Sequence, residues 1–108
     1  MKTIERNING VIVNQRGRDN YFLLSDILAV VTKCNEGKKK RDKFSFKKYK
    51  KSKSTKRFFK YLRKELNIKK PFKPEKKSKW VSPLVALDIL SNACPKFRAD
   101  ILTYANSF

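Results

Sequence analysis

The chain has 108 residues, of which 28 are lysine or arginine and only 9 are aspartate or glutamate, so its formal net charge is +19. Hydrophobic residues make up 40% of the sequence, which is enough at this length for one domain with its own core. A charge of this size favours nucleic acid, an anionic membrane or an acidic protein as the partner, and the absence of histidine removes the most common acid–base catalyst.

The two cysteines and the N-terminus bear on the environment of the protein. Cys34 and Cys94 have no histidine to complete a zinc site, and both are expected to be reduced, buried side chains. The first residues, MKTIERNING, are too polar for a secretory signal, and no apolar run approaches the roughly 20 residues that span a bilayer. We therefore expect a soluble intracellular protein with no metal, no cofactor and no membrane partner.

Two apolar runs near the N-terminus predict β-structure. Residues 4–14 contain β-branched side chains, and residues 21–25 form a second apolar run. The turn-forming residues 16–20 separate the two runs, so we expect a β-hairpin.

A short helix is expected to follow. Ser25 is suited to its N-cap, and Asp26 in the first turn favours the positive end of a helix. Apolar side chains recur at helical spacing at Ile27, Val30, Val31 and Cys34. Gly37 is expected to stop the helix.

The middle of the chain begins with a basic loop. KKKR at 38–41 is too charged to pack, and it also has the composition of a nuclear localisation signal. Phe44, Phe46 and Tyr49 interrupt the lysines that follow, which predicts a short helix or turn with these aromatic side chains directed inward.

A helical wheel of residues 55–66 separates two kinds of side chain. The apolar side carries Phe58, Phe59, Leu62 and Leu66. The opposite side carries Lys56, Arg57, Lys60, Arg63 and Lys64. Ser54 or Thr55 is suited to the N-cap, so this basic stretch is predicted to be a folded helix and not a solvated tail.

The last third of the chain alternates a loop, a strand and helices. Residues 67–79 contain two prolines and six lysines, which predicts a basic loop, and Trp80 and Val81 suit a short strand after it. A basic loop that returns to a strand is typical of the wing of a winged-helix protein. Ser82-Pro83 is a typical helix start, with Leu84, Leu87 and Leu90 at helical spacing. A second helix is expected after Pro95, with an inward face formed by Phe97, Ile101, Tyr104 and Phe108.

Three blocks of sequence carry a family resemblance. The first is YFLLSDI at 21–27, the second joins Phe46 and Tyr49 to KST at 53–55, Phe58 and Leu62, and the third joins WVSP at 80–83 and Ala86 to CPKF at 94–97. In this order they resemble the KilA-N domain of DNA viruses and phages, which is related to the fungal APSES DNA-binding domain. Leu23, Tyr49 and Ser82 stand where the family pattern has Asn, Trp and His, and the glycines that are common in the family's wing are absent.

The resemblance implies an α+β, winged-helix-like domain over residues 1–108 that binds DNA. Its parts would be an N-terminal β-hairpin, a basic helical segment at 47–57, a wing-like loop at 67–79 with its strand, and C-terminal helices. The resemblance also implies a viral or phage origin, action in a host nucleus or a cytoplasmic viral factory, and fusion of this N-terminal part to a further domain. A homodimer on DNA is a further arrangement to be tested.

The expected function is double-stranded DNA binding, mainly through phosphates. The candidate contact residues are Lys47, Lys48, Lys50, Lys51, Lys53, Lys56, Arg57, Lys69, Lys70, Lys73, Lys76, Lys77 and Lys79. Because lysine neutralises phosphate and arginine reads bases better, we expect modest sequence preference. The candidates for base contacts are Arg16, Arg18, Arg41 and Arg57. Phe72 is a weaker candidate for a groove wedge, and packing under the wing is preferred.

Two other classes of function stay open. Exposed stacking aromatics at Phe44, Phe46, Tyr49 or Phe72 would favour RNA or single strands, whereas inward-facing ones favour a duplex. A module for acidic proteins would not distinguish DNA from other polyanions. An enzyme is not expected, because the acidic residues form no paired metal-binding spacing; a nuclease built around Asp19 or Asp42 is the minor alternative.

Overall fold

A computed structural model describes residues 3–99 of the chain, which form an α+β domain. Its strands are β1 (Thr3–Ile8), β2 (Val11–Arg16), β3 (Phe22–Leu23), β4 (Phe72–Glu75) and β5 (Ser78–Val81). They form one antiparallel sheet in the order β1-β2-β3-β5-β4. The helices are α1 (Leu24–Asn35), the short 3₁₀ helix η1 (Lys40–Asp42), α2 (Phe46–Lys51), α3 (Lys53–Glu65) and α4 (Pro83–Ala93), and residues 95–99 are also helical. The predicted α+β class is therefore confirmed.

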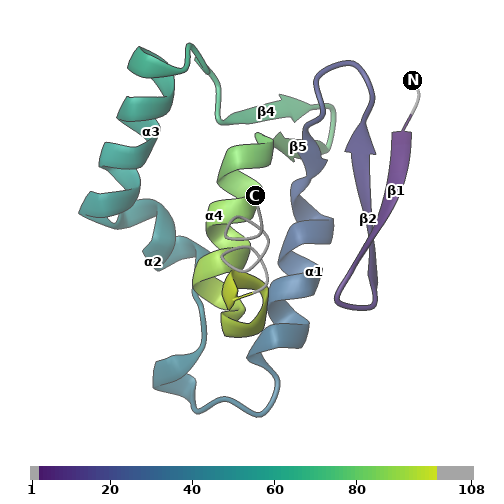
Figure 1. The fold of residues 1–108 in the computed structure, drawn as a ribbon, viewed down its shortest axis with the longest axis vertical. Coiled ribbons are helices and arrows are strands. Elements are labelled where there is room, and N and C mark those ends of the chain that lie inside the picture. The colour runs from purple at the N-terminus through teal and green to yellow at the C-terminus, as the bar shows by residue number, and fades with distance from the viewer. Residues whose placement is uncertain (1–2, 100–108) are drawn as a thin grey trace.

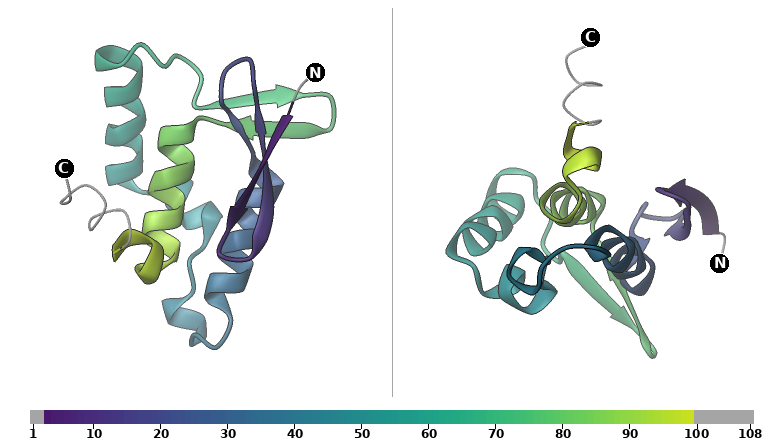
Figure 2. Two further views of the ribbon diagram at one scale, coloured as in Figure 1. Left: turned by 45° about the vertical axis from the view of Figure 1, so that its right-hand side comes forward. Right: turned by 90° about the horizontal axis from the view of Figure 1, so that it is seen from below.

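The helices lie in a row across the molecule. Figure 1 shows α1 between the β1–β2 hairpin and α4, with α2 and α3 on the other side of α4. The β4–β5 hairpin crosses one end of this row, where β5 pairs with β3 (Figure 2). The two segments that carry most of the lysines therefore border the same scaffold, and the base of the β4–β5 hairpin packs against α2 and α3.

The core lies where α1 and α4 pack against each other and against strands β2 and β5. Its fully buried side chains include Val13, Ile27, Val30, Val81, Val85 and Ile89. The predicted apolar face of α1 is confirmed, since Ile27, Val30 and Val31 are all buried. Fully burying side chains of this kind contributes about 1.5–3 kcal/mol each before the entropy cost of ordering them.

The N-terminal region holds two hairpins where one was expected. Asn9 and Gly10 both have positive φ (53° and 85°), and they form a tight turn between β1 and β2 inside the run that was predicted as one piece. An Asn-Gly pair between two β-branched runs is the sequence signal for this turn. The expected turn at 16–20 is present as well, and it joins β2 to β3.

The start of α1 also differs from the expectation. Leu23 is the N-cap residue, and Ser25 lies exposed within the first turn, so the predicted Ser25 cap is wrong. Asp26 is in the first turn as predicted. Its Oδ2 atom accepts hydrogen bonds from the backbone N–H of Asn14 (2.9 Å) and from the Asn14 side chain (3.0 Å), which ties the helix start to β2. The helix ends at Asn35, and Gly37 follows with a φ of 78°.

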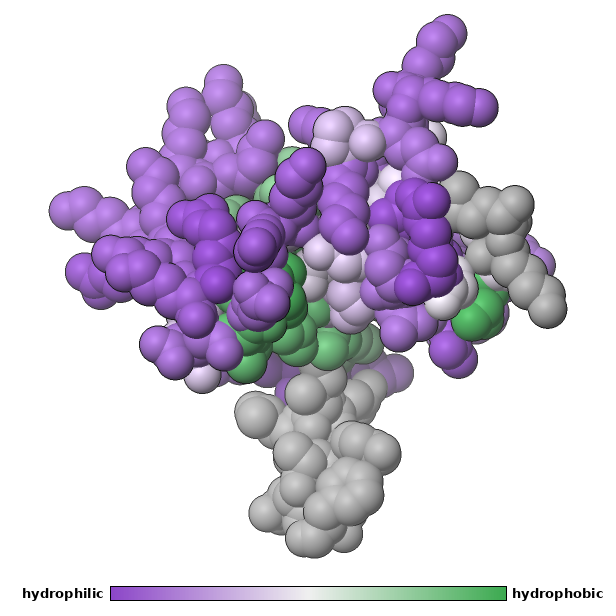
Figure 3. All heavy atoms as spheres, turned by 90° about the horizontal axis from the view of Figure 1, so that it is seen from above, coloured by the Kyte–Doolittle hydropathy of each residue, from purple (hydrophilic) through white to green (hydrophobic). Residues whose placement is uncertain are grey.

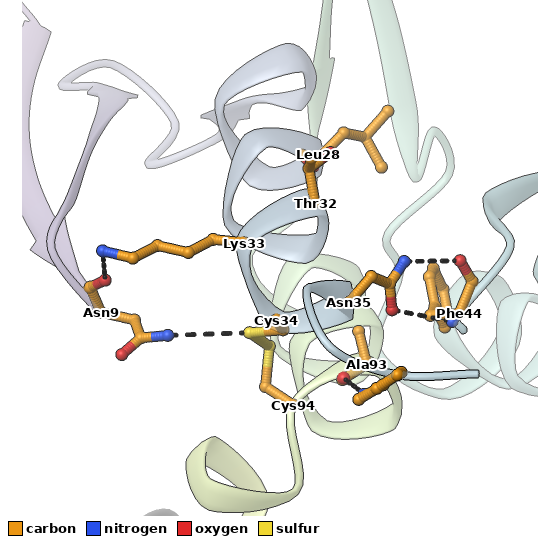
Figure 4. The surroundings of a disulfide bond; sticks show 10 residues. Asn9, Leu28, Thr32, Lys33, Cys34, Asn35, Phe44, Ala93 and Cys94 are labelled. Atoms are coloured by element: carbon orange, nitrogen blue, oxygen red, sulfur yellow. Dashed lines mark hydrogen bonds between the residues drawn. A yellow bond between two sulfur atoms is a disulfide. The ribbon is translucent and has the colours of Figure 1, made fainter. Parts of the chain in front are cut away.

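The two cysteines form a disulfide, so the prediction that they are reduced is wrong for this structure. Cys34 lies in the last turn of α1 and Cys94 is the C-cap residue of α4, with their Cα atoms 5.6 Å apart (Figure 4). The reason is tertiary: α1 packs along α4, and this brings together two thiols that are 60 residues apart in the sequence. Lys38 reinforces the same junction by donating from Nζ to the carbonyl of Ala93 (2.7 Å).

The scaffold helix α4 begins as the sequence predicts. Pro83 occupies the first turn after the N-cap residue Ser82. Leu90 is buried, but Leu84 and Leu87 are 38% and 41% exposed. The buried face is formed instead by Val85, Ala86, Ile89, Leu90 and Ala93. The expected inward face of the last helix falls mostly on Ile101, Tyr104 and Phe108, which lie outside the described residues. Within the described part of the chain, no helix is long and apolar enough to cross a membrane.

Candidate nucleic-acid interface

The basic segment is divided into two helices at Ser52. Ser45 caps α2, because its hydroxyl accepts a hydrogen bond from the backbone N–H of Lys48 (3.3 Å). Ser52 has extended backbone angles and is both the C-cap of α2 and the N-cap of α3. Helix α3 therefore starts at Lys53, earlier than the predicted cap at Ser54 or Thr55.

The predicted amphipathic character of α3 is largely confirmed. Leu62 is 1% exposed, and Phe58 and Phe59 are half-buried against the core. Leu66 is the exception, since it follows the last helical residue and is 47% exposed. The opposite face carries exposed cations at Lys56, Arg57, Lys60, Arg63 and Lys64.

An aromatic cluster holds α2 and α3 against β4. Phe44, Phe46, Tyr49, Phe59 and Phe72 are linked pairwise, with ring centroids 5.6 to 6.3 Å apart. None of these rings is free to stack on a base, because all of them are half-buried or buried. Phe72 packs edge-on against Phe46 and Phe59, so the preferred packing role is confirmed over the groove wedge.

Tyr49 fixes this cluster to the scaffold. Its hydroxyl donates to Asp88 Oδ2 on α4 at 2.6 Å. Burial, together with this hydrogen bond and the carboxylate charge, raises the pKa of the Tyr49 phenol far above its ordinary value. The phenol is therefore a stable hydrogen-bond donor, and it sets the position of α2 relative to α4.

The segment predicted as a loop at 67–79 contains a β-hairpin. Lys69 and Lys70 lie in the connection from α3, Lys73 is on β4, Lys76 and Lys77 form the turn, and Lys79 is on β5. Pro74 is tolerated in β4 because this strand is at the edge of the sheet. Lys76 takes a left-handed conformation in the turn (φ 55°), a position where glycine is usual.

A buried arginine anchors the hairpin. Arg16 is 1% exposed, and its guanidinium contacts Asp19 Oδ2 and Glu75 Oε2, both at 2.6 Å, while it stacks over the Trp80 ring at 4.8 Å. Arg18 also reaches Glu75, at 3.2 Å. The prediction that Arg16 contacts bases is therefore wrong, because its partners hold it in the interior.

Asp19 is held in its ionised form by the same network. Partial burial on its own would raise the pKa of this carboxyl, but hydrogen bonds from Arg16, from the backbone of Tyr21 and from Lys73 outweigh it and lower the pKa below its ordinary value. Lys73 Nζ lies 3.3 Å from Asp19 Oδ2 and 4.3 Å from the centre of the Tyr21 ring. Lys73 is thus only partly available to an external anion.

The structure exposes the other candidate contact residues. All of them except Lys73 have exposed side chains, and no carboxylate of residues 3–99 lies within 4.0 Å of their charged groups. Figure 3 shows that hydrophilic side chains project from two lobes, one over α2 and α3 and the other over the β4–β5 hairpin. Arg41 and Arg57 are also exposed, so they remain available for base contacts, whereas the 38–41 segment partly folds into η1.

The described residues contain no arrangement that resembles a metal centre. Among residues 3–99, no three histidine, cysteine, aspartate or glutamate side chains are placed to hold a metal ion together. Asp19 is paired with Arg16 and Lys73, and Asp42 is exposed on η1. The two carboxylates considered for a nuclease are therefore not brought together with a third acidic ligand.

Comparison with known proteins agrees with the sequence blocks. The family model of the KilA-N domain matches residues 4–108, which is nearly the whole chain. Searches of curated proteins and of solved structures returned no match. KilA-N domains are DNA-binding domains, which supports nucleic-acid binding by this chain. The chain belongs to the KilA-N domain family.

Proposed function

We propose that this domain binds double-stranded DNA in the manner of a winged helix. In this proposal the end of α2 and the start of α3 lie at the major groove, and the β4–β5 hairpin acts as the wing on the neighbouring groove or backbone. The observation that carries the proposal is the pair of exposed lysine clusters on α2–α3 and on the hairpin, with scarcely any carboxylate to neutralise them. Cations held in this way match the demand of a phosphate backbone.

The aromatic cluster favours a duplex over a single strand. Binding of unpaired bases depends on exposed rings that can stack on them. Phe44, Phe46, Tyr49 and Phe72 instead pack inward and support the lysine-bearing helix. Since the exposed cations are mostly lysine, backbone contacts should dominate and sequence preference should be modest.

A salt titration tests the proposal. Binding to a labelled duplex is measured as the salt concentration rises from about 50 to 300 mM, with single-stranded DNA, RNA and heparin as competitors. If about 6 phosphates are neutralised, log K should fall against log salt with a slope near −5. Duplex preference that persists above about 150 mM salt supports docking of the helix and the wing, whereas equal displacement by every competitor would contradict it.

Paired variants locate the contact. The double substitution Lys76→Ala and Lys77→Ala should reduce the size of the salt slope by about 2, because two phosphate contacts are lost from the hairpin turn. Lys96→Ala with Arg98→Ala removes the same charge from exposed side chains beyond α4 and should leave the slope nearly unchanged. Equal effects of the two pairs would mean that the hairpin acts only through the net charge.

A further inference from the structure

The junction between α2 and α3 presents backbone donors that have no acceptor. The first intrahelical hydrogen bond of α3 runs from the N–H of Lys56 to the carbonyl of Ser52. The N–H groups of Lys53, Ser54 and Thr55 precede it and therefore have no partner within the helix. Ser52 does not cap them, because its hydroxyl pairs with that of Ser54 at 3.0 Å.

Thr55 gives an independent indication of a ligand at the same place. Its side chain is 4% exposed, and its hydroxyl makes no side-chain hydrogen bond among residues 3–99. The one fully enclosed side-chain oxygen without a partner in these residues is Ser82 Oγ, so the Thr55 hydroxyl is open to the hollow beside it. Thr32 in α1 shows the usual alternative, since its hydroxyl donates to the carbonyl of Leu28 one turn earlier (3.0 Å). Thr55 lines a hollow of about 550 Å³ at the α2–α3 junction, and the surrounding protein leaves its hydroxyl free for a bound group.

The other groups around this hollow identify the class of ligand. Lys43 and Lys48 line its outer part with exposed ammonium groups. One carboxylate, Asp88, also lines it, but its Oδ2 already accepts from Tyr49 at 2.6 Å and its Oδ1 lies 3.4 Å from the Asn92 side-chain nitrogen. Backbone N–H groups, hydroxyls and lysines together favour an oxyanion with several acceptor oxygens over a cation.

We propose that the α2–α3 junction is a binding site for one phosphate group, held by the N–H groups of Lys53, Ser54 and Thr55, the Thr55 hydroxyl and the Lys48 ammonium. The site deepens the proposed function and rests on it for the source of the phosphate, which is the nucleic-acid backbone. Such a contact fixes the position of α3 on a strand without reading bases. It would set the register at which Arg57, the fifth residue of α3, reaches a base edge.

The first experiment uses inorganic phosphate as the probe and amide chemical shifts as the readout. In a titration of the whole ¹⁵N-labelled chain, the amides of Lys53, Ser54 and Thr55 should shift together and saturate. Thr55→Val keeps the shape and removes the hydroxyl, and it should weaken phosphate binding about three- to ten-fold, as expected for one lost hydrogen bond. Thr32→Val removes a hydroxyl that is already satisfied in α1 and should leave phosphate binding unchanged.

The second experiment separates this site from the proposed function. Thr55→Val should weaken duplex binding about three- to ten-fold with an unchanged salt slope, whereas Lys48→Ala should reduce the size of the slope by about 1. If Thr55→Val binds duplex DNA as tightly as the unmodified chain does, and phosphate does not shift the amide signals of residues 53–55, the proposed site is overturned and the proposed function is not. If phosphate shifts these amide signals to saturation but the protein shows no preference for a duplex, the proposed function is overturned and the proposed site is not.

Ser54→Ala provides a second test of the site if the Thr55→Val variant does not fold. Ser54 is exposed, so its substitution should leave the thermal midpoint nearly unchanged. It removes the hydroxyl that occupies Ser52 Oγ, and the freed Ser52 hydroxyl can then cap the N–H groups of the first turn. Phosphate affinity should fall, and an unchanged affinity in this folded variant would overturn the site.

Discussion

At the scale of single residues, Arg16 shows most clearly how tertiary partners decide the role of a charged side chain. A run of turn formers with two arginines reads as an exposed loop, and exposed arginines are good base readers. Arg16 is instead enclosed by Asp19, Glu75 and Trp80. Glu75 is 59 residues away along the chain, so no local pattern could have identified the pairing.

The Asp19 carboxylate makes the stability of this network dependent on pH. Its pKa is lowered by folding, so its contribution is fully present above the unfolded pKa of about 3.9 and is lost as the pH falls through the lower folded value. Asp19→Asn should lower the free energy of unfolding by roughly 1–3 kcal/mol at pH 7, because a charged partner of buried Arg16 is lost. The deficit should shrink below about pH 4.

Urea unfolding of both proteins between about pH 2.5 and 7 measures this difference. Asp42→Asn removes the same charge from an exposed side chain and controls for net charge. A deficit that stays constant down to pH 2.5 would mean that Asp19 acts through packing and not through its charge.

At the scale of elements, the sequence predicts those helices and strands whose signals are local. The amphipathic helix α3, the Ser82-Pro83 start of α4, the inward aromatics and the strand at Trp80 were all expected. The break between α2 and α3 was expected at Ser54 or Thr55 but lies at Ser52. Its position depends on the separate packing of Tyr49 and Leu62 against the core, which the spacing of apolar residues does not reveal. The hairpin at 72–81 was predicted as a loop because Pro74 argues against a central strand, but β4 is an edge strand.

The contribution of the β1–β2 turn to stability can be tested by substituting Gly10, with Gly37 as the matched control. Gly10 and Gly37 both have positive φ, so alanine should cost each about 1 kcal/mol in backbone strain. A Cβ at Gly10 would also lie 2.7 Å from Lys33 Nζ, which donates to the Asn9 carbonyl at 3.0 Å, whereas Gly37 has open space around it. Gly10→Ala should therefore cost about 0.5–1.5 kcal/mol more than Gly37→Ala.

Urea unfolding of the two variants gives the comparison directly. Equal losses of stability would show that the Lys33 contact contributes nothing to the closure of the turn. A larger loss for Gly37→Ala would contradict the placement of the β1–β2 turn against the end of α1.

At the scale of the whole molecule, a modest core and one disulfide hold the folded chain together against the repulsion of its high positive charge. The formal charge of +19 opposes compaction through self-repulsion, and the described residues supply only four ion pairs to offset it. The Cys34–Cys94 disulfide joins the ends of the two central helices and closes a loop across a sequence separation of 60 residues. The sequence alone did not show that these two cysteines are paired, because only the packing of α1 along α4 brings them together.

Reduction of this disulfide should destabilise the protein. A loop of this length is expected to contribute roughly 2–4 kcal/mol through the restricted unfolded chain. The thermal midpoint should fall on addition of dithiothreitol, and a Cys34→Ser, Cys94→Ser double variant should match the reduced protein and not respond to the reductant. Titration of free thiols in the native protein should find none, and two reactive thiols would contradict the pairing.

The disulfide also encloses the segment with the candidate contact residues in a covalently closed loop. Every candidate contact residue, from Lys47 to Lys79, lies between Cys34 and Cys94 and so belongs to this loop. A protease that cuts once after any of those lysines opens the loop but releases no fragment, and the two pieces separate only when the bond is reduced. The α2–α3 segment and the β4–β5 hairpin therefore stay covalently joined after a single cut that would divide a chain without the disulfide.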